Sequence, residues 1–339
     1  MSSNIKNIEF DTELSPGAYN AINVCLRLKP EERITLVTDE ESIEIAASLV
    51  NEIEKTGSKY RLFLLEDIAN RPLKRMPEII LNDLPKSQAS ILAVVTQPNE
   101  LQSRIQMLSL INKNKIRHGH MVNISKQIML EGMRADFLEV DDLSRKLVEK
   151  ARKAKEIRAV SGGGTNIKAE FSPNLKWIKT SGIISPDEWG NLPGGEIFTA
   201  PFNLNGRFVV DGVVGDYLCQ RYGDLKEFPL TIEIVNNKIK ELHCENQELL
   251  NEFTAYTMSD ENSSRVGEFA IGTNTAVKNI IGQILQDEKL PGVHIAFGNP
   301  APEHTGADWT SSTHIDCVGR GFDIWMDEDK VMENGKFLI

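Results

Sequence analysis

Short apolar runs alternate with longer amphipathic stretches through the first half of this sequence. Residues 33–38, 60–65 and 91–96 are apolar runs of strand length, and residues 40–55 show the apolar spacing of a helix. Two further elements continue the plan, a weaker strand at residues 121–124 and a charged helix over residues 141–155. Because strands that alternate with helices are typical of a parallel sheet covered by helices, this half is predicted to be an α/β domain.

The pattern changes in the second half, where turns become dense and short β-rich runs such as residues 207–214 follow one another closely. Helices are predicted again at residues 244–257 and 275–288. We therefore expect two domains: an α/β domain over residues 1–156, then an α+β domain with a mixed or antiparallel sheet over residues 157–339.

Neither half shows a nucleotide-binding motif. The first predicted strand is followed by Asp39 and Glu40, not by the glycine-rich turn that exposes backbone N–H groups to a phosphate. The glycines at residues 162–164 lie between two predicted strands and lack the Gly-Lys-Ser/Thr ending of a phosphate loop. A hairpin turn is the interpretation that fits them.

Composition narrows the class of protein further. The formal net charge of −11 disfavours binding to nucleic acid phosphates or to anionic membranes. The first residues are polar, and no stretch of about 18 uncharged apolar residues occurs, so neither export nor membrane insertion is predicted. The four cysteines are scattered without a C-x-x-C spacing, which is typical of a reducing compartment. A cytoplasmic protein is expected.

The candidate chemistry lies near the end of the sequence. His314 and Asp316 are two residues apart in a predicted strand, so both side chains leave the same face. An imidazole beside a carboxylate suits a divalent metal ion with mixed nitrogen and oxygen ligands, although an ion pair at a sheet edge has the same sequence. His294, Glu268 and Glu196 each open another apolar β-like run, where a buried polar group needs a partner.

These five residues indicate a metal site but leave its chemistry open. Two glutamates, two histidines and an aspartate are about what a two-metal hydrolytic site uses. Alternatively, His294, His314 and Asp316 form a two-histidine, one-carboxylate set of the type that binds a single Fe(II) ion.

The blocks that contain these residues resemble the thermophilic-type metallo-aminopeptidases, the group of aminopeptidase T and aminopeptidase S. In chain order they are Asn191-Leu-Pro-Gly-Gly-Glu-Ile-Phe-Thr-Ala-Pro, Gly267-Glu-Phe-Ala-Ile-Gly-Thr-Asn, Gly292-Val-His-Ile-Ala-Phe-Gly and His314-Ile-Asp. The resemblance implies a homodimeric hydrolase with two divalent ions (zinc, cobalt or manganese), which cleaves an amide or peptide bond near a free amino terminus. The implied ligands are Glu196, Glu268, His294, His314 and Asp316, with Glu196 also a candidate catalytic residue.

The sequence also departs from that group. The family places a tyrosine shortly after the first histidine, whereas this chain has none there, and His294 and His314 are closer together than in the family. A shorter branch of the group is related to 2,5-dihydroxypyridine 5,6-dioxygenase, a ring-cleaving enzyme with one Fe(II) ion held by two histidines and an aspartate. His314 and Asp316 match its H-x-D pair, so that activity is the alternative. An inactive or peptide-tailoring relative that binds metal is a third.

Three further residues are candidates outside the five ligands. His304 lies on a predicted loop and is a candidate catalytic proton shuttle in place of the missing tyrosine. Arg117 and His120 lie in a segment interpreted as a basic loop of the first domain. They are predicted to bind the carboxylate of a small-molecule or short-peptide substrate, with the first domain as a wall of the cleft.

Overall fold

The computed structural model describes residues 5, 8–187 and 189–339. Contacts between residues divide the chain into two compact units. Unit 1 comprises Met1–Leu138 and Gly182–Gly194, and unit 2 comprises Glu139–Ser181 and Gly195–Ile339.

This division differs from a single boundary after residue 156. Most of helix α6 (Phe137–Ala151) belongs to unit 2, because its apolar residues Leu147, Val148 and Ala151 are buried in the core of that unit. The later segment Gly182–Gly194 returns to unit 1, where it adds a short strand to the sheet. Packing of apolar side chains, not chain order, therefore sets the limits of the two units.

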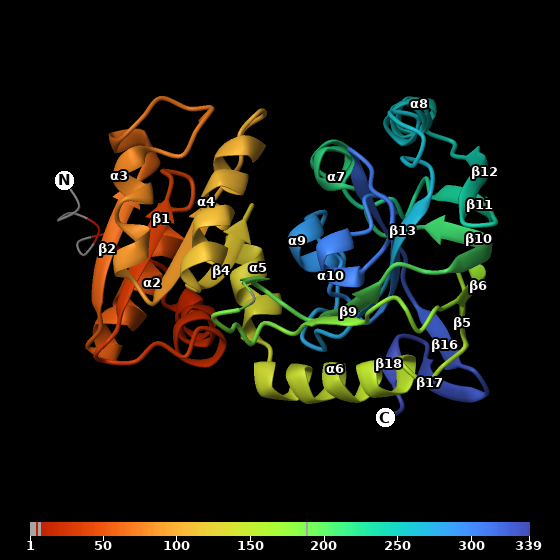
Figure 1. Cartoon of the computed structure of the whole chain (residues 1–339), viewed down its shortest axis with the longest axis horizontal. Coiled ribbons are helices and arrows are strands. Elements are labelled where there is room, and N and C mark those ends of the chain that lie inside the picture. The colour runs from red at the N-terminus through yellow and green to blue at the C-terminus, as the bar shows by residue number, and fades with distance from the viewer. Residues whose placement is uncertain (1–4, 6–7, 188) are drawn as a thin grey trace. The chain divides into compact units, whose positions relative to one another are not determined.

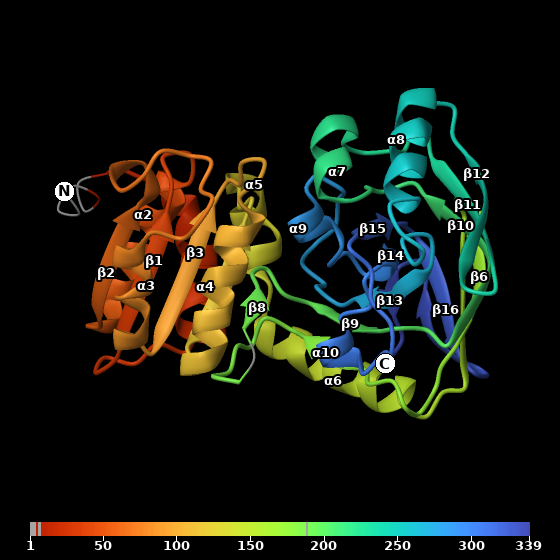
Figure 2. The same cartoon turned by 45° about the horizontal axis from the view of Figure 1, so that its top comes forward.

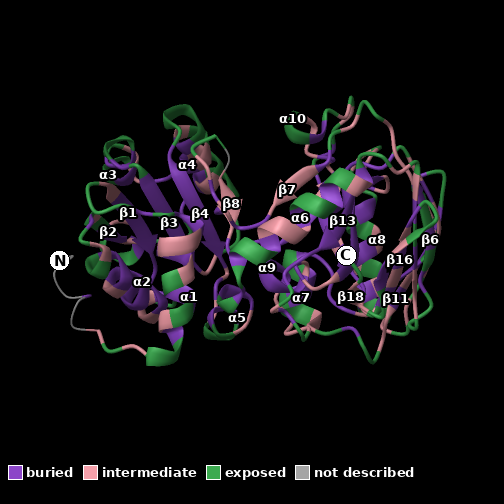
Figure 3. Cartoon of the chain, turned by 90° about the horizontal axis from the view of Figure 1, so that it is seen from below, coloured by how far each residue is buried: buried purple, intermediate pink, exposed green. Residues whose placement is uncertain are grey.

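Unit 1 is an α/β unit with a five-stranded parallel sheet, as the alternating pattern predicts (Figure 1). The strand order is β2-β1-β3-β4-β8, and all neighbouring pairs are parallel. The strands are β1 (Arg33–Thr38), β2 (Lys59–Leu64), β3 (Ala89–Val94), β4 (Arg117–Val122) and β8 (Gly190–Asn191). Every residue of β3 and β4 is buried, as expected for strands covered on both faces (Figure 3).

Helices precede the first strand and connect the later ones. They are α1 (Ser15–Tyr19), α2 (Ile43–Thr56), α3 (Glu78–Leu81), α4 (Leu101–Asn114) and α5 (Lys126–Leu130), with further helical segments at Thr12–Leu14, Asn20–Cys25, Leu65–Asp67, Leu84–Lys86 and Gly132–Arg134. Ile80 of α3 and Met107 and Ile111 of α4 share one apolar cluster with Leu92 and Val94 of β3, so these two helices cover one face of the sheet.

A buried arginine joins the carboxyl ends of the first three strands. Arg71 makes ion pairs with Asp39 after β1 at 2.7 Å, with Glu66 after β2 at 3.3 Å and with Glu100 at 2.6 Å. Its guanidinium also donates to the carbonyl of Val95, directly after β3, at 2.6 Å. This is the edge of a parallel sheet at which α/β proteins commonly bind ligands, and here the chain's own ion pairs occupy it.

Unit 2 contains two antiparallel sheets (Figure 2). The larger has the order β12-β11-β10-β6-β5-β16-β17-β18, and the smaller has the order β15-β14-β13-β9-β7. The strands are β5 (Glu156–Ser161), β6 (Asn166–Glu170), β7 (Ile178–Thr180), β9 (Glu196–Thr199), β10 (Asn203–Val210), β11 (Leu230–Val235), β12 (Lys238–His243), β13 (Val266–Gly272), β14 (Gly292–Gly298), β15 (His314–Val318), β16 (Phe322–Met326), β17 (Asp329–Glu333) and β18 (Lys336–Phe337). Side chains of both sheets form one core, for example Phe208 and Ile232 from the larger and Phe269 and Ile295 from the smaller. The predicted fold class is confirmed.

Two local predictions in unit 2 have different outcomes. The glycines at residues 162–164 form the turn of the antiparallel hairpin β5–β6, as predicted. The helix predicted over residues 275–288 is wrong for most of its length, because only α9 (Ile284–Asp287) is helical there. The carboxylate of Asp287 accepts hydrogen bonds from the amides of Ile281 and Gln283, and these local bonds compete with a helix.

The remaining helices of unit 2 are α7 (Asp216–Tyr222), α8 (Gln247–Thr257) and α10 (Pro302–Thr305). None of the helices in the described part of the chain is both long enough and apolar enough to span a membrane.

We predict that Arg71→Ala destabilises the protein strongly. The substitution leaves Asp39 and Glu100 buried without their cation, and removal of one partner from a buried ion pair costs about 3–5 kcal/mol. Unfolding by urea, followed by circular dichroism, measures the loss. The control is Arg145→Ala, whose partners Asp142 and Glu149 are solvent-exposed, and it should hardly move the midpoint. Equal midpoints for the two variants would contradict the structural role given to Arg71.

Candidate metal centre

The five predicted ligands alternate with core residues along four strands of the smaller sheet. Glu196 opens β9, Glu268 lies in β13, His294 lies in β14, and His314 and Asp316 lie in β15. Their strand neighbours that face the core are Ile197, Phe269, Val293, Ile295, Ile315 and Cys317. Since successive side chains of a strand point to opposite faces, the five polar side chains leave the sheet on the face away from that core.

Their donor atoms converge in two groups that share Glu268. One group is Glu196, Glu268 and His294, and the other is Glu268, His314 and Asp316; within each group the atoms lie within 4.8 Å of one another. The individual distances are 3.4 Å between His294 Nε2 and Glu268 Oε1, 3.5 Å between His294 Nε2 and Glu196 Oε2, and 3.4 Å between His314 Nε2 and Asp316 Oδ1. Such sets of nitrogen and oxygen donors suit a divalent metal ion.

The strand register leaves space at this position. Ala296 of β14 pairs with Glu268 on one side and with Asp316 on the other, so a methyl group separates the two carboxylates in the sheet. A larger side chain there would fill the volume between them.

His294 fits a metal ligand because its ring nitrogen faces two carboxylates without forming a hydrogen bond to either. Its Nε2 atom is buried and, among the described residues, makes no hydrogen bond. Burial lowers the pKa of His294, but the nearby carboxylates of Glu268 and Glu196 outweigh it and raise that pKa above its ordinary value. A field that favours a proton on this nitrogen also favours a metal cation beside it.

His314 is oriented by its backbone environment. Its Nδ1 lies 2.9 Å from the carbonyl oxygen of Asn299, which can only accept, so Nδ1 carries the proton and Nε2 is left toward Asp316. A carbonyl that fixes the tautomer is typical of metal-binding histidines. The turn before His314 is also fixed in place. The carboxylate of Asp260 accepts hydrogen bonds from the amide of Ser312 and from the hydroxyl of Ser311. The phenol of Tyr256 donates to the carbonyl of His314 at 3.2 Å.

Glu196 is held by two donors on one of its oxygens. Oε1 accepts a hydrogen bond from the hydroxyl of Thr180 at 2.8 Å and an ion pair from Lys289 Nζ at 2.7 Å. Burial raises the pKa of Glu196, but Lys289 and His294 outweigh it and lower that pKa below its usual range. Glu196 therefore stays a carboxylate at neutral pH, with Oε2 directed to His294.

Lys289 was not predicted from the sequence, although it is part of the centre. Its side chain is 1% exposed, and its ammonium also pairs with Glu288. Burial raises the pKa of Glu288 to about 8, although Lys289 opposes that effect. Asp287, Glu288 and Lys289 have the composition of a solvated helix end, so nothing in the sequence signals the burial of Lys289.

His304, the candidate proton shuttle, lies outside the two groups of converging donors. His304 lies on α10, its side chain is 46% exposed, and its Nε2 is 3.8 Å from Glu303. It belongs to neither ligand group among the described residues.

The prediction that Arg117 and His120 lie in a basic loop is wrong, because both are buried in strand β4. Arg117 forms an ion pair with Glu32 and donates to the carbonyl of Arg27 at 3.2 Å. The ring of His120 packs against His118 and Trp189, and burial lowers the pKa of His120 well below its ordinary value. Pairing of the segment with β3 accounts for this burial, and the charge of Arg117 is already compensated within unit 1.

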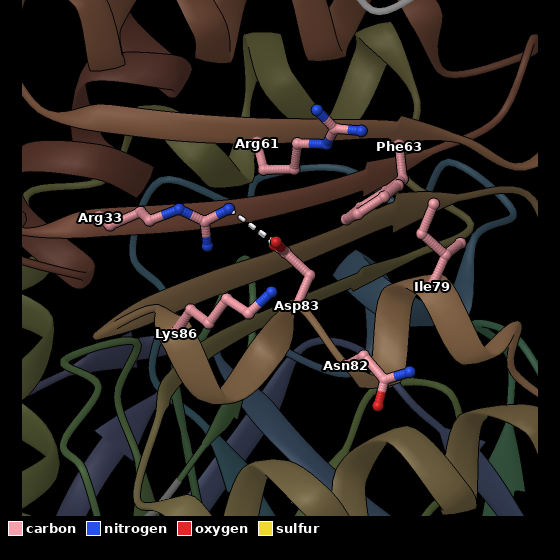
Figure 4. A pocket seen from close by; sticks show the side chains of 7 residues that line it. All are labelled: Arg33, Arg61, Phe63, Ile79, Asn82, Asp83 and Lys86. Carbon is pink, nitrogen blue, oxygen red and sulfur yellow. Dashed lines mark hydrogen bonds and ion pairs between the residues drawn. The ribbon is translucent and has the colours of Figure 1, made fainter.

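A surface pocket of unit 1 contains none of the candidate residues. It lies where β1 begins and is lined by Arg33, Arg61, Phe63, Ile79, Asn82, Asp83 and Lys86 (Figure 4). Arg33 pairs with Asp83 at 2.8 Å across its wall.

Two solved structures have a similar fold over nearly their full length, each with a TM-score of 0.68. The 2,5-dihydroxypyridine dioxygenase from Pseudomonas putida KT2440 is 13% identical, with 96% of both chains covered. AmpT from Thermus thermophilus is 15% identical, with 98% of this chain and 100% of AmpT covered. No curated protein sequence matches this chain.

The family comparison covers the part of the chain that contains the candidate metal centre. The model of the thermophilic metalloprotease family M29 matches residues 139–320, more than half of the chain. All five predicted ligands lie in that range. This chain therefore belongs to the thermophilic metalloprotease family M29.

Proposed function

We propose that this chain is a metal-dependent hydrolase that cleaves an amide or peptide bond next to a free amino terminus. Membership of a metalloprotease family supports metal-dependent hydrolysis. Cleavage next to a free amino terminus is supported by the convergence of three ligand carboxylates, Glu196, Glu268 and Asp316, with two imidazoles on one sheet face. That acidic face complements the ammonium group of a free amino terminus.

Glu268, His314 and Asp316 would hold a divalent ion of the zinc, cobalt or manganese type, and Glu196 and His294 provide the donors next to it. When bound, such an ion polarises the carbonyl of the scissile bond and lowers the pKa of a water molecule. The chain's residues supply orientation and charge: Asn299 fixes the tautomer of His314, and Lys289 keeps Glu196 ionised. An ionised Glu196 can accept a hydrogen bond from a water molecule at its other oxygen, Oε2.

The alternative is a ring-cleaving Fe(II) dioxygenase, which the similarity in fold to 2,5-dihydroxypyridine dioxygenase raises. That chemistry needs His294, His314 and Asp316 to converge on one ion. Among the described residues, each group of converging donors contains one histidine and two carboxylates, and no group holds both histidines. This geometry supports a hydrolase over the dioxygenase. A relative that binds metal without catalysis is the remaining alternative.

We expect His314→Ala and Asp316→Ala each to abolish stoichiometric metal binding without unfolding the protein, because the hydrophobic core of unit 2 lies on the other face of the sheet. Glu268→Ala should be at least as damaging, since Glu268 belongs to both donor groups. Elemental analysis of protein purified without chelator measures the metal, and circular dichroism monitors the fold. The matched control is His304→Ala, an exposed histidine of the same unit, which should retain wild-type metal content. Full metal content in the His314 and Asp316 variants would show that the ligands lie elsewhere.

The reaction class is tested by the requirement for oxygen. Hydrolysis needs none, so the protein with zinc, cobalt or manganese restored should release product from an aminoacyl amide under nitrogen at the same rate as in air. The comparison is oxygen uptake in air, with Fe(II) restored and a dihydroxypyridine as substrate. Oxygen-dependent consumption of the dihydroxypyridine, with no turnover of the amide, would establish the dioxygenase and reject the hydrolase.

A further inference from the structure

We infer that Lys289 is a built-in cation that takes the place of a second metal ion beside Glu196, so that the centre holds one ion, at Glu268, His314 and Asp316. The inference rests on the proposed metal-dependent function. It goes further by assigning the number of ions and the residue that determines it.

The ammonium of Lys289 is fixed against Glu196 from within the protein. The side chain is 1% exposed, and its Nζ contacts two acidic side chains, Glu196 at 2.7 Å and Glu288. A buried ammonium is retained only where a carboxylate such as that of Glu196 compensates it. Lys289 therefore cannot turn out into solvent without leaving the Glu196 carboxylate without its cation.

The backbone around Lys289 is equally constrained. Its amide donates to the carbonyl of Gln286 at 2.8 Å, and its carbonyl accepts from Asn274 at 3.1 Å. Gly272, the strand partner of Glu196, faces this segment so closely that a Cβ atom on it would lie 2.1 Å from the carbonyl oxygen of Leu290. The absence of a side chain at Gly272 is what allows the backbone of Lys289 to approach Glu196.

The two donor groups differ in their charge because of this lysine. In the group with Glu196, one carboxylate oxygen is already bound to an ammonium, and an ion placed on the other oxygen would meet that positive charge at short range. In the other group, neither Glu268 nor Asp316 has a lysine or arginine nitrogen within 4.0 Å among the described residues. A dication is therefore favoured at Glu268, His314 and Asp316. Nε2 of His294, 3.4 Å from Glu268 and without a hydrogen bond among the described residues, remains available to a water molecule.

The number of zinc ions per chain tests the inference without any measurement of activity. Apoprotein titrated with zinc chloride in a calorimeter, followed by gel filtration and elemental analysis, should bind one ion per chain. Lys289→Ala removes the ammonium and leaves Glu196, Glu288 and His294 without it, so this variant should bind two. The matched control is Lys289→Arg, which keeps the positive charge and should bind one.

Each outcome has a distinct meaning. Two zinc ions on the wild-type chain would overturn the inference and leave the proposed function standing. No zinc on the wild-type chain would overturn the metal centre itself, and the proposed function with it. A single ion on Lys289→Ala, folded by circular dichroism, would also overturn the role of Lys289. If Lys289→Ala does not fold as apoprotein, refolding in the presence of zinc with two ions bound supports the inference, and no rescue by zinc contradicts it.

Discussion

The carboxylates buried on one face of the smaller sheet each need positive charge nearby, and the centre is arranged around that need. Lys289 pairs directly with Glu196 of the sheet, and it also contacts Glu288, which lies after α9 outside the sheet. His314 and His294 lie 3.4 Å from Asp316 and Glu268, so each ring can pair with its carboxylate as an imidazolium or act beside it as a neutral metal ligand. The fold therefore leaves part of its negative charge for a ligand cation to balance.

Antiparallel pairing explains how residues far apart in the sequence reach this face. Four strands bring Glu196, Glu268, His294 and the pair His314 and Asp316 side by side, while their alternate residues fill the core between the two sheets. The same strands thus provide both the stability and the donor set. Two small residues are also needed for this arrangement. Ala296 leaves space between Glu268 and Asp316, and Gly272 allows the backbone next to Lys289 to pack closely against β13.

The sequence predicted the parts of this arrangement that depend on local periodicity. The two-residue spacing of His314 and Asp316 and the apolar runs after His294, Glu268 and Glu196 were enough to locate the strands. Their convergence on one face follows from strand order, which spacing alone does not determine.

The errors arose where long-range packing overrides local composition. Arg117 and His120 lie in a segment with the polarity of a loop, but pairing with β3 and partners such as Glu32 make it a buried strand. Lys289 has the composition of a solvated surface, and only its contact with Glu196 from another strand reveals that it is buried. The division into two units also differs from the predicted boundary after residue 156, because α6 packs into unit 2.

Anomalous diffraction from crystals grown with zinc locates a bound ion independently of activity and of stoichiometry in solution. We predict a strong zinc peak at about 2.0–2.2 Å from the carboxylate oxygens of Glu268 and Asp316 and from Nε2 of His314. A peak at other side chains, such as the buried pair His118 and His120, with none at Glu268, His314 and Asp316, would contradict it.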